Sequence, residues 1–145
     1  PVPITMQTLV VLMAGVMLGG GRGALSQGVY VLAGIAGLPI FSSMASGLAW
    51  LGGPTGGYLV GFIVAPLVIS MVLGDSGSYL RLLLGLTAGT LTILVFGTAW
   101  FAVLSDGGLL NAINLAFLPF VPGAIVKIGL ASAITEGVRK AGKRR

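Results

Sequence analysis

The sequence has no cysteine and no histidine, and only three of its 145 residues are acidic. Without cysteine the chain has no disulfide and no thiolate nucleophile. Without histidine, and with so few carboxylates, it has almost no ligands for a metal ion and no recognisable acid–base pair. It also lacks the Gly-Lys-Ser/Thr ending of a phosphate-binding loop, so we expect that the chain does not itself hydrolyse ATP. We therefore expect a protein that is not an enzyme and has no cofactor.

Charged residues of either sign are scarce as well. They make up 8% of the chain, against about 25% in a typical soluble domain. Hydrophobic residues make up 56%, and the mean hydropathy is +1.08. Because so few charges cannot cover a surface that faces water, we expect an all-α membrane protein. The length corresponds to one domain, so residues 1–145 are predicted to form a single transmembrane helical domain.

The net charge of +5 and the isoelectric point near 10.3 could suggest a nucleic-acid-binding protein. However, five of the eight basic residues lie in the segment 139–145. Such a tail is typical of the cytoplasmic edge of a membrane protein, and we expect no nucleic acid among the partners.

Five apolar segments, separated by glycine-rich turns and one long loop, are predicted to cross the bilayer. The turns carry Gly-Asp or Asp-Gly pairs, which end helices, or a run of glycines around Arg22. The predicted helices span residues 5–18, 24–37, 57–73, 79–104 and 109–138, the last of them broken around 119–123.

The loop over residues 38–57 is apolar and has no charged residue. A loop this long and this apolar is expected to pack on the bundle, and we interpret it as a partly buried lid on the outer side. The alternative is a loop on the membrane surface that Trp50 anchors.

The positions of the basic residues predict the orientation of the chain. The tail at 139–145 is expected in the cytoplasm, which gives a multi-pass protein with a cytoplasmic C-terminus. Alternating crossings then place Arg81 and Arg22 on the same side and the loop 38–57 outside. They also place Pro1 outside, which indicates that a helix precedes the segments seen here.

Lys127 is the one basic residue predicted to lie far from a membrane edge. A cation at that depth costs a few kcal/mol, so it marks a functional site by default. We predict that Lys127 meets the carboxylate of a small ligand in an apolar pocket on the outer side. The alternative is snorkelling toward one interface, for which the reach is too long. Further polar groups for that pocket are Gln7, Tyr30, Ser43, Thr55, Tyr58, Asn111 and Asn114.

Five short motifs follow one another along nearly the whole chain: Pro-Val-Pro-Ile-Thr-Met-Gln-Thr-Leu (1–9), Gly-Ala-Leu-Ser (23–26), Gly-Leu-Pro-Ile-Phe (37–41), Gly-Pro-Thr-Gly-Gly-Tyr (53–58) and Leu-Pro-Phe-Val-Pro-Gly-x-x-x-Lys (118–127). In this order they resemble the BioY family, the biotin-specific substrate-binding (S) components of energy-coupling-factor (ECF) transporters. The resemblance implies an S-component-like bundle with five transmembrane helices of a six-helix family fold, because the family has a helix before the motif at 1–9.

The resemblance also implies capture and uptake of biotin across the cytoplasmic membrane of a bacterium or archaeon. The implied partners are biotin, a transmembrane ECF coupling protein, two ATPase subunits and the lipid bilayer. The outer loops, including Phe41 and Ser43, and the start of the last helix with Lys127 would form the biotin site. The family usually has an acidic residue where this chain has Ala124. Positions 124 and 127 share a helix face, so we predict that Ala124→Asp raises biotin affinity.

Two other functions remain open from the sequence. Residues 55–58, Thr-Gly-Gly-Tyr, distantly resemble the carbonyl-lined filter of a potassium channel, which would make the chain a small pore. Alternatively, the chain is a structural subunit of a membrane complex whose broken helix only packs against its neighbours.

Overall fold

The computed structural model describes residues 7–41, 46–75 and 78–143. These residues are helical apart from short connections, and they form no β-strand. The elements are α1 (Gln7–Leu18), α2 (Gly20–Ile35), α3 (Leu48–Leu51), α4 (Gly56–Leu73), α5 (Tyr79–Leu104), α6 (Gly108–Ala112), the π-helix η2 (Ile113–Phe117), the 3₁₀-helix η3 (Leu118–Phe120) and α7 (Val121–Lys143).

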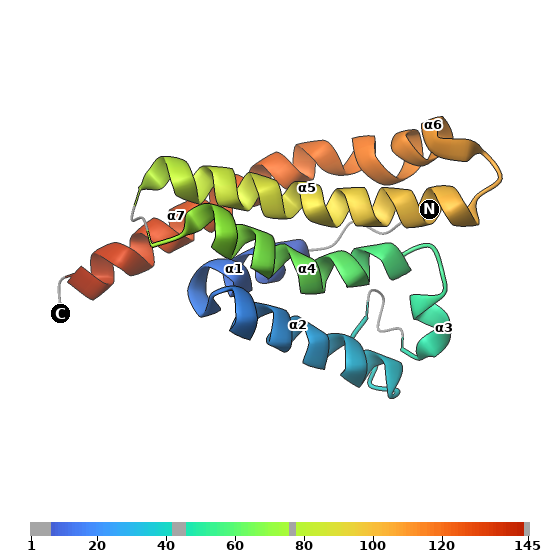
Figure 1. Ribbon diagram of the computed structural model, residues 1–145, viewed down its shortest axis with the longest axis horizontal. Coiled ribbons are helices and arrows are strands. Elements are labelled where there is room, and N and C mark those ends of the chain that lie inside the picture. Colours follow the sequence, from blue (N-terminus) through green and yellow to red (C-terminus); the bar gives the residue numbers. More distant parts are fainter. Residues whose placement is uncertain (1–6, 42–45, 76–77, 144–145) are drawn as a thin grey trace.

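The bundle is built around the antiparallel pair of α4 and α5, which lie side by side in its middle (Figure 1). The continuous run from α6 to α7 lies along α5, and α2 covers the opposite side of α4. The short helix α1 packs on α2, α4 and α7, so it separates the space beside α2 from the space beside α7.

Glycines allow α4 and α5 to approach closely. A Cβ atom on Gly57 would overlap the carbonyl of Phe96 and the side chain of Trp100, and one on Gly61 would press on Ile93. In lipid, where helix association depends on van der Waals packing, small residues at the contact are the usual solution. The first two turns of α4 are therefore held firmly against the second half of α5.

The predicted fold class is confirmed: the described residues form an all-α membrane bundle with five long helical segments. Three of these, α4, α5 and the run 108–142, are long and apolar enough to cross a bilayer, and α1 is a shorter apolar helix. Large apolar side chains point outward along them, for example Met71 on α4 and Val103 on α5. A bilayer accommodates such a surface, because hydrocarbon replaces the water that these side chains avoid.

The turn predicted at the run of glycines around Arg22 is much shorter in the structure than the sequence suggested. The interruption is confined to Gly19, which has φ 84°, and α2 begins at Gly20. The start of α2 must pack tightly on α4, since a Cβ on Gly20 would press on Ser70 and one on Gly23 on Pro66. Gly20 and Gly23 are thus used for close packing rather than for a loop.

The break in the last segment lies earlier than predicted. The distorted region is η2 and η3, residues 113–120, and α7 resumes at Val121. Pro119 lies inside the distorted region and has no N–H with which to continue an α-helix. Pro122 and Gly123 belong to the first turn of α7, where a proline is tolerated.

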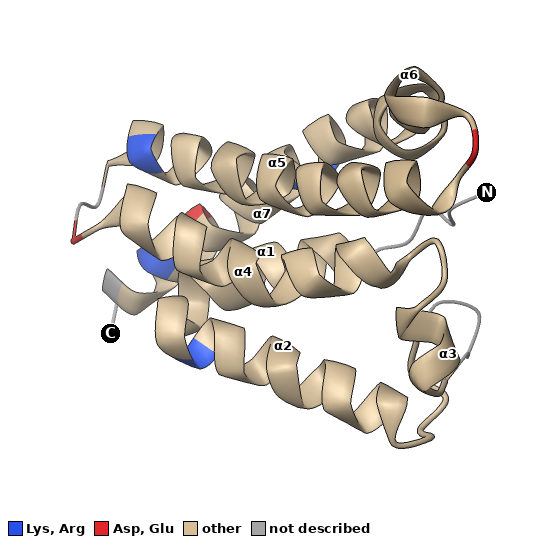
Figure 2. Ribbon diagram, turned by 45° about the vertical axis from the view of Figure 1, so that its right-hand side comes forward, with Lys and Arg blue, Asp and Glu red and all other residues tan. Residues whose placement is uncertain are grey.

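The basic residues on α2, α5 and the end of α7 gather at one end of the bundle (Figure 2), whereas Lys127 lies in the second turn of α7. Loop 38–57, as far as it is described, packs at the opposite end. It contains α3, buries Phe41 to 3% exposure, and receives a hydrogen bond of 2.9 Å from Trp100 Nε1 to the carbonyl of Gly53.

Candidate functional site

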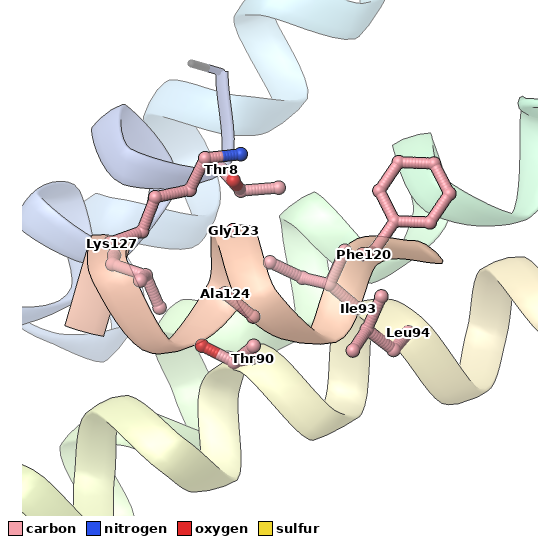
Figure 3. A pocket seen from close by; sticks show the side chains of 9 residues that line it. Thr8, Thr90, Ile93, Leu94, Phe120, Gly123, Ala124 and Lys127 are labelled. Carbon is pink, nitrogen blue, oxygen red and sulfur yellow. The ribbon is translucent and has the colours of Figure 1, made fainter. Parts of the chain in front are cut away.

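Lys127 lines a small pocket among three helices. The pocket has a volume of about 30 Å³. It is lined from α1, α5, the end of η3 and the start of α7 by Thr8, Leu12, Thr90, Ile93, Leu94, Phe120, Gly123, Ala124 and Lys127. Figure 3 shows the amino group of Lys127 turned toward Thr8, and Ala124 on the side of α7 that faces Thr90. The lining is therefore apolar, with an ammonium and two hydroxyl groups.

The position of Lys127 follows from the broken helix. Because α7 begins at Val121, Lys127 lies in its second turn, with Ala124 one turn before it. The residue is only 9% exposed, so its side chain is directed into the bundle. A buried ammonium of this kind suits a carboxylate.

The Lys127 pocket is too small for a vitamin in this conformation. A volume of about 30 Å³ holds about one water molecule, whereas sites for small organic ligands usually measure roughly 300–1,000 Å³. A ligand that reaches Lys127 must therefore separate α1, α5 and α7 or bring only its charged end into the pocket.

A second, larger cavity lies on the other side of α1. It has a volume of about 600 Å³ and is open on one side. Its polar members are Gln7 on α1 and Ser26, Gln27 and Tyr30 on α2; the remaining lining is apolar. Two predicted site residues, Gln7 and Tyr30, thus lie together here, separated from Lys127 by the helix α1.

Gln7 and Tyr30 bond to each other. The Gln7 side-chain amide donates to the Tyr30 hydroxyl at 2.5 Å, and that hydroxyl donates to the carbonyl of Ile40 at 2.9 Å. These two bonds join α1, α2 and the loop after α2. The ring of Tyr30 also meets Phe41 edge-on, with centroids 5.7 Å apart.

The other predicted residues are distributed around the same end of the bundle. Phe41 is packed against α2 at Gly34 and belongs to the core that contains Tyr58 and Phe62. Tyr58 is buried, and its hydroxyl donates to the carbonyl of Ala116 in the broken helix. Thr55 immediately precedes α4.

Ser43 lies outside the described residues. Asn111 and Asn114 lie on α6 and η2, outside the linings of the two cavities as the described residues define them. The stretch 55–58, which resembled a channel filter, forms the start of α4 and packs on α5 through Gly57.

Sequence reasoning did not identify Thr8 and Thr90 as site residues. Thr90 donates its hydroxyl proton to the carbonyl of Leu86 at 2.8 Å, which leaves lone pairs on its oxygen for another donor. Thr8 follows Gln7 directly, and neighbours in a helix point about 100° apart, so the two side chains face different cavities. No signal in the sequence shows which of them faces Lys127.

Comparison with known proteins supports one family. The model of the BioY family matches residues 1–144. A probable biotin transporter BioY of Pyrococcus horikoshii is 38% identical over 136 residues, which cover 94% of this chain and 80% of the relative. The biotin transporter BioY of Thermotoga maritima is 34% identical over 140 residues, covering 97% and 82%. The crystal structure of an S-component for biotin from an ECF-type ABC transporter matches with a TM-score of 0.88 and 30% identity, covering 97% of this chain and 77% of that one.

Proposed function

Because this chain belongs to the BioY family, we propose that it captures biotin for uptake across the cytoplasmic membrane, as the S component of an ECF transporter. The relatives are named as transporters, and the chain is a binding protein rather than an enzyme. The observation that carries the proposal is the burial of Lys127 in an apolar pocket of the membrane bundle.

The chemistry of biotin fits this pocket at one end. Its carboxylate, at the tip of an aliphatic chain, can accept charge-assisted hydrogen bonds from the ammonium of Lys127. The Thr8 hydroxyl supplies a further donor from the opposite wall. A carboxylate offsets the cost of holding a cation in hydrocarbon, which gives the chain a reason to retain Lys127 there.

The remainder of the ligand needs more room than the pocket now has. We propose that α1 and the start of α7 separate as biotin enters, with the rings of the ligand packed against apolar side chains of α5 and Phe120. Such widening is a population shift toward an open conformation that biotin binds better. In this arrangement Phe41, Thr55 and Tyr58 belong to the outer end, through which the ligand arrives.

The cavity beside Gln7 and Tyr30 is the second candidate for the biotin site. Its volume of about 600 Å³ favours it, because a small ligand fits without rearrangement. Among the described residues that line it, none is basic. A carboxylate placed there would lack the charged partner that Lys127 offers, so we assign the carboxylate to the Lys127 pocket.

We further propose that the domain 1–145 works with a transmembrane ECF coupling protein and two ATPase subunits, which supply the energy for uptake. Its basic end is proposed to face the cytoplasm, with the C-terminus on that side.

Isothermal titration of the purified chain with biotin in detergent tests the function. We expect saturable binding of one biotin per chain. We also expect the uncharged methyl ester of biotin to compete only weakly with biotin for this site. Absence of any binding heat and of any shift in melting temperature at saturating biotin would favour the structural-subunit alternative. Ion flux in proteoliposomes without biotin would favour a pore.

A further inference from the structure

The side chain of Tyr58 connects α4 to the broken helix. Its hydroxyl donates to the carbonyl of Ala116, which is fully buried in η2. Tyr58 itself is 7% exposed. Sequence reasoning placed Tyr58 among residues that touch the ligand, but the structure gives its hydroxyl a partner in the protein.

The Ala116 carbonyl lies where the backbone hydrogen bonding changes register. The N–H of Leu118 bonds to the carbonyl of Ile113 with π spacing, and the N–H of Val121 bonds to Leu118 with 3₁₀ spacing. Inside a bilayer every backbone group needs a partner within the protein. A side-chain donor at Ala116 therefore stabilises the break at one definite place.

The ring of Tyr58 fixes the residue that follows the break. It packs on the ring of Phe120 with centroids 5.8 Å apart and an angle of 42° between the planes. Phe120 lines the Lys127 pocket and immediately precedes α7. One side chain on α4 thus contacts both the carbonyl within the break and the aromatic wall of the pocket.

Tyr58 is held rigidly by its own surroundings. Its ring occupies the space beside Gly97 of α5, where a Cβ atom would collide with it. Its neighbour Gly57 packs directly on the backbone of α5 at Phe96. Because the ring of Tyr58 is fixed by α4 and α5, the start of α7 must adopt the position that this ring allows.

We infer that Tyr58 is a positioning residue for biotin binding: it sets the break at residues 113–120 and so places Phe120 and Lys127 to receive the carboxylate. Tyr58 acts through Ala116 and Phe120 and does not touch the ligand. The inference rests on the proposed function and adds a determinant of affinity that lies outside the pocket lining. It predicts that disturbing Tyr58 harms recognition of the charged end of biotin in particular.

The test measures Kd for biotin and for its uncharged methyl ester, which retains the rings and lacks the anionic end. In Tyr58→Phe the contact with Phe120 remains and the hydrogen bond to Ala116 is lost. We expect biotin affinity to fall about tenfold, ester affinity to stay within about twofold, and the preference for biotin over the ester to fall accordingly.

The matched control is Tyr79→Phe, which removes a 3.2 Å hydrogen bond to Ser132 between α5 and α7 at the other end of the bundle. The control should retain the wild-type preference.

A second variant disturbs Tyr58 without removing its hydroxyl, so the inference can still be tested if Tyr58→Phe does not fold. Gly97→Ala keeps the Tyr58 hydroxyl but pushes its ring, and we expect the same selective loss of preference for the acid. An equal loss for biotin and ester in both variants would show that Tyr58 contacts the rings or supports the fold in general, and would overturn the inference. Wild-type affinity in both variants would overturn it as well. If the wild-type chain does not bind biotin, the proposed function fails. If the wild-type chain binds acid and ester alike, the assignment of the carboxylate to Lys127 fails. Both results concern the wild-type chain alone, so they are distinguishable from a failure of the inference about Tyr58.

Discussion

Gln7 and Thr8 are adjacent in α1, yet they line different cavities: Gln7 the large cavity beside α2, and Thr8 the small pocket that contains Lys127. The helix α1 is thus a wall with a candidate site on each side. The side of α1 on which biotin binds is the first question for experiment.

Two substitutions, one in each cavity, answer it. Thr8→Val removes a hydroxyl from the Lys127 pocket, and we expect biotin affinity to fall about fivefold with little change in stability. Tyr30→Phe removes the bonds to Gln7 and Ile40, and we expect a melting temperature lower by a few degrees with biotin affinity within twofold of wild type. Titration calorimetry and thermal melts give both values. A larger loss of affinity in Tyr30→Phe than in Thr8→Val would assign biotin to the larger cavity.

Ala124 provides a test of how the pocket is tuned. It lines the pocket and lies one turn before Lys127, so a carboxylate at 124 would face the same space. We expect Ala124→Asp to raise biotin affinity severalfold, because an acid one turn before Lys127 orients the ammonium. Ala124→Asn, of similar size and without charge, is the control. Lower affinity in the Asp variant alone would indicate that the chain has adapted to a different ligand.

The orientation in the membrane is testable with single cysteines, because the chain has none of its own. Asp106 and Ala141 are both exposed. Asp106 lies in the turn between α5 and α6 and Ala141 near the end of α7, and these two segments lie at opposite ends of the bundle (Figure 1). We expect a membrane-impermeant maleimide to label Asp106→Cys in intact cells and Ala141→Cys only after permeabilisation. The reverse pattern would contradict a cytoplasmic C-terminus.

The close contact of α4 and α5 gives a prediction about stability. A methyl group at Gly57 has no room, whereas Gly129 on the exposed face of α7 has no atom within 4 Å of the position a Cβ would take. We expect Gly57→Ala to cost about 1–3 kcal/mol. We expect Gly129→Ala to be neutral or stabilising by up to about 1 kcal/mol, because alanine favours a helix more than glycine does. Thermal melts in detergent compare the two, and equal melting temperatures would argue against the packing of α4 on α5 described here.

The sequence predicted the helices where one local signal dominates. The fourth segment was predicted at 79–104, and α5 has those bounds, because the long apolar run is limited by polar turns at both ends. The glycines before Ala24 were misread as a turn, since their use depends on Pro66 and Ser70, which lie far along the chain. Similarly, the prolines marked the break in the last helix, but the π-helical residues before them have no sequence signal.

The sequence likewise predicted only the part of the candidate site that depends on a local signal. Lys127 is recognisable from its depth in an apolar segment, which is a property of the sequence alone. The division of the predicted residues between two cavities depends on how α1 packs between α2 and α7, a contact that no local pattern specifies. Tyr58 shows the same limit, because its partner Ala116 is 58 positions away in the sequence.

The most direct measurement is the affinity of Lys127→Met for biotin, compared with Lys140→Met as the control. Lys127 is buried in its pocket, whereas Lys140 is exposed near the end of α7. Loss of a charge-assisted bond to the carboxylate predicts a Kd about 10–100-fold higher for Lys127→Met and an unchanged Kd for Lys140→Met. An unchanged Kd in a folded Lys127→Met variant would contradict the proposal that this buried ammonium binds the carboxylate of biotin.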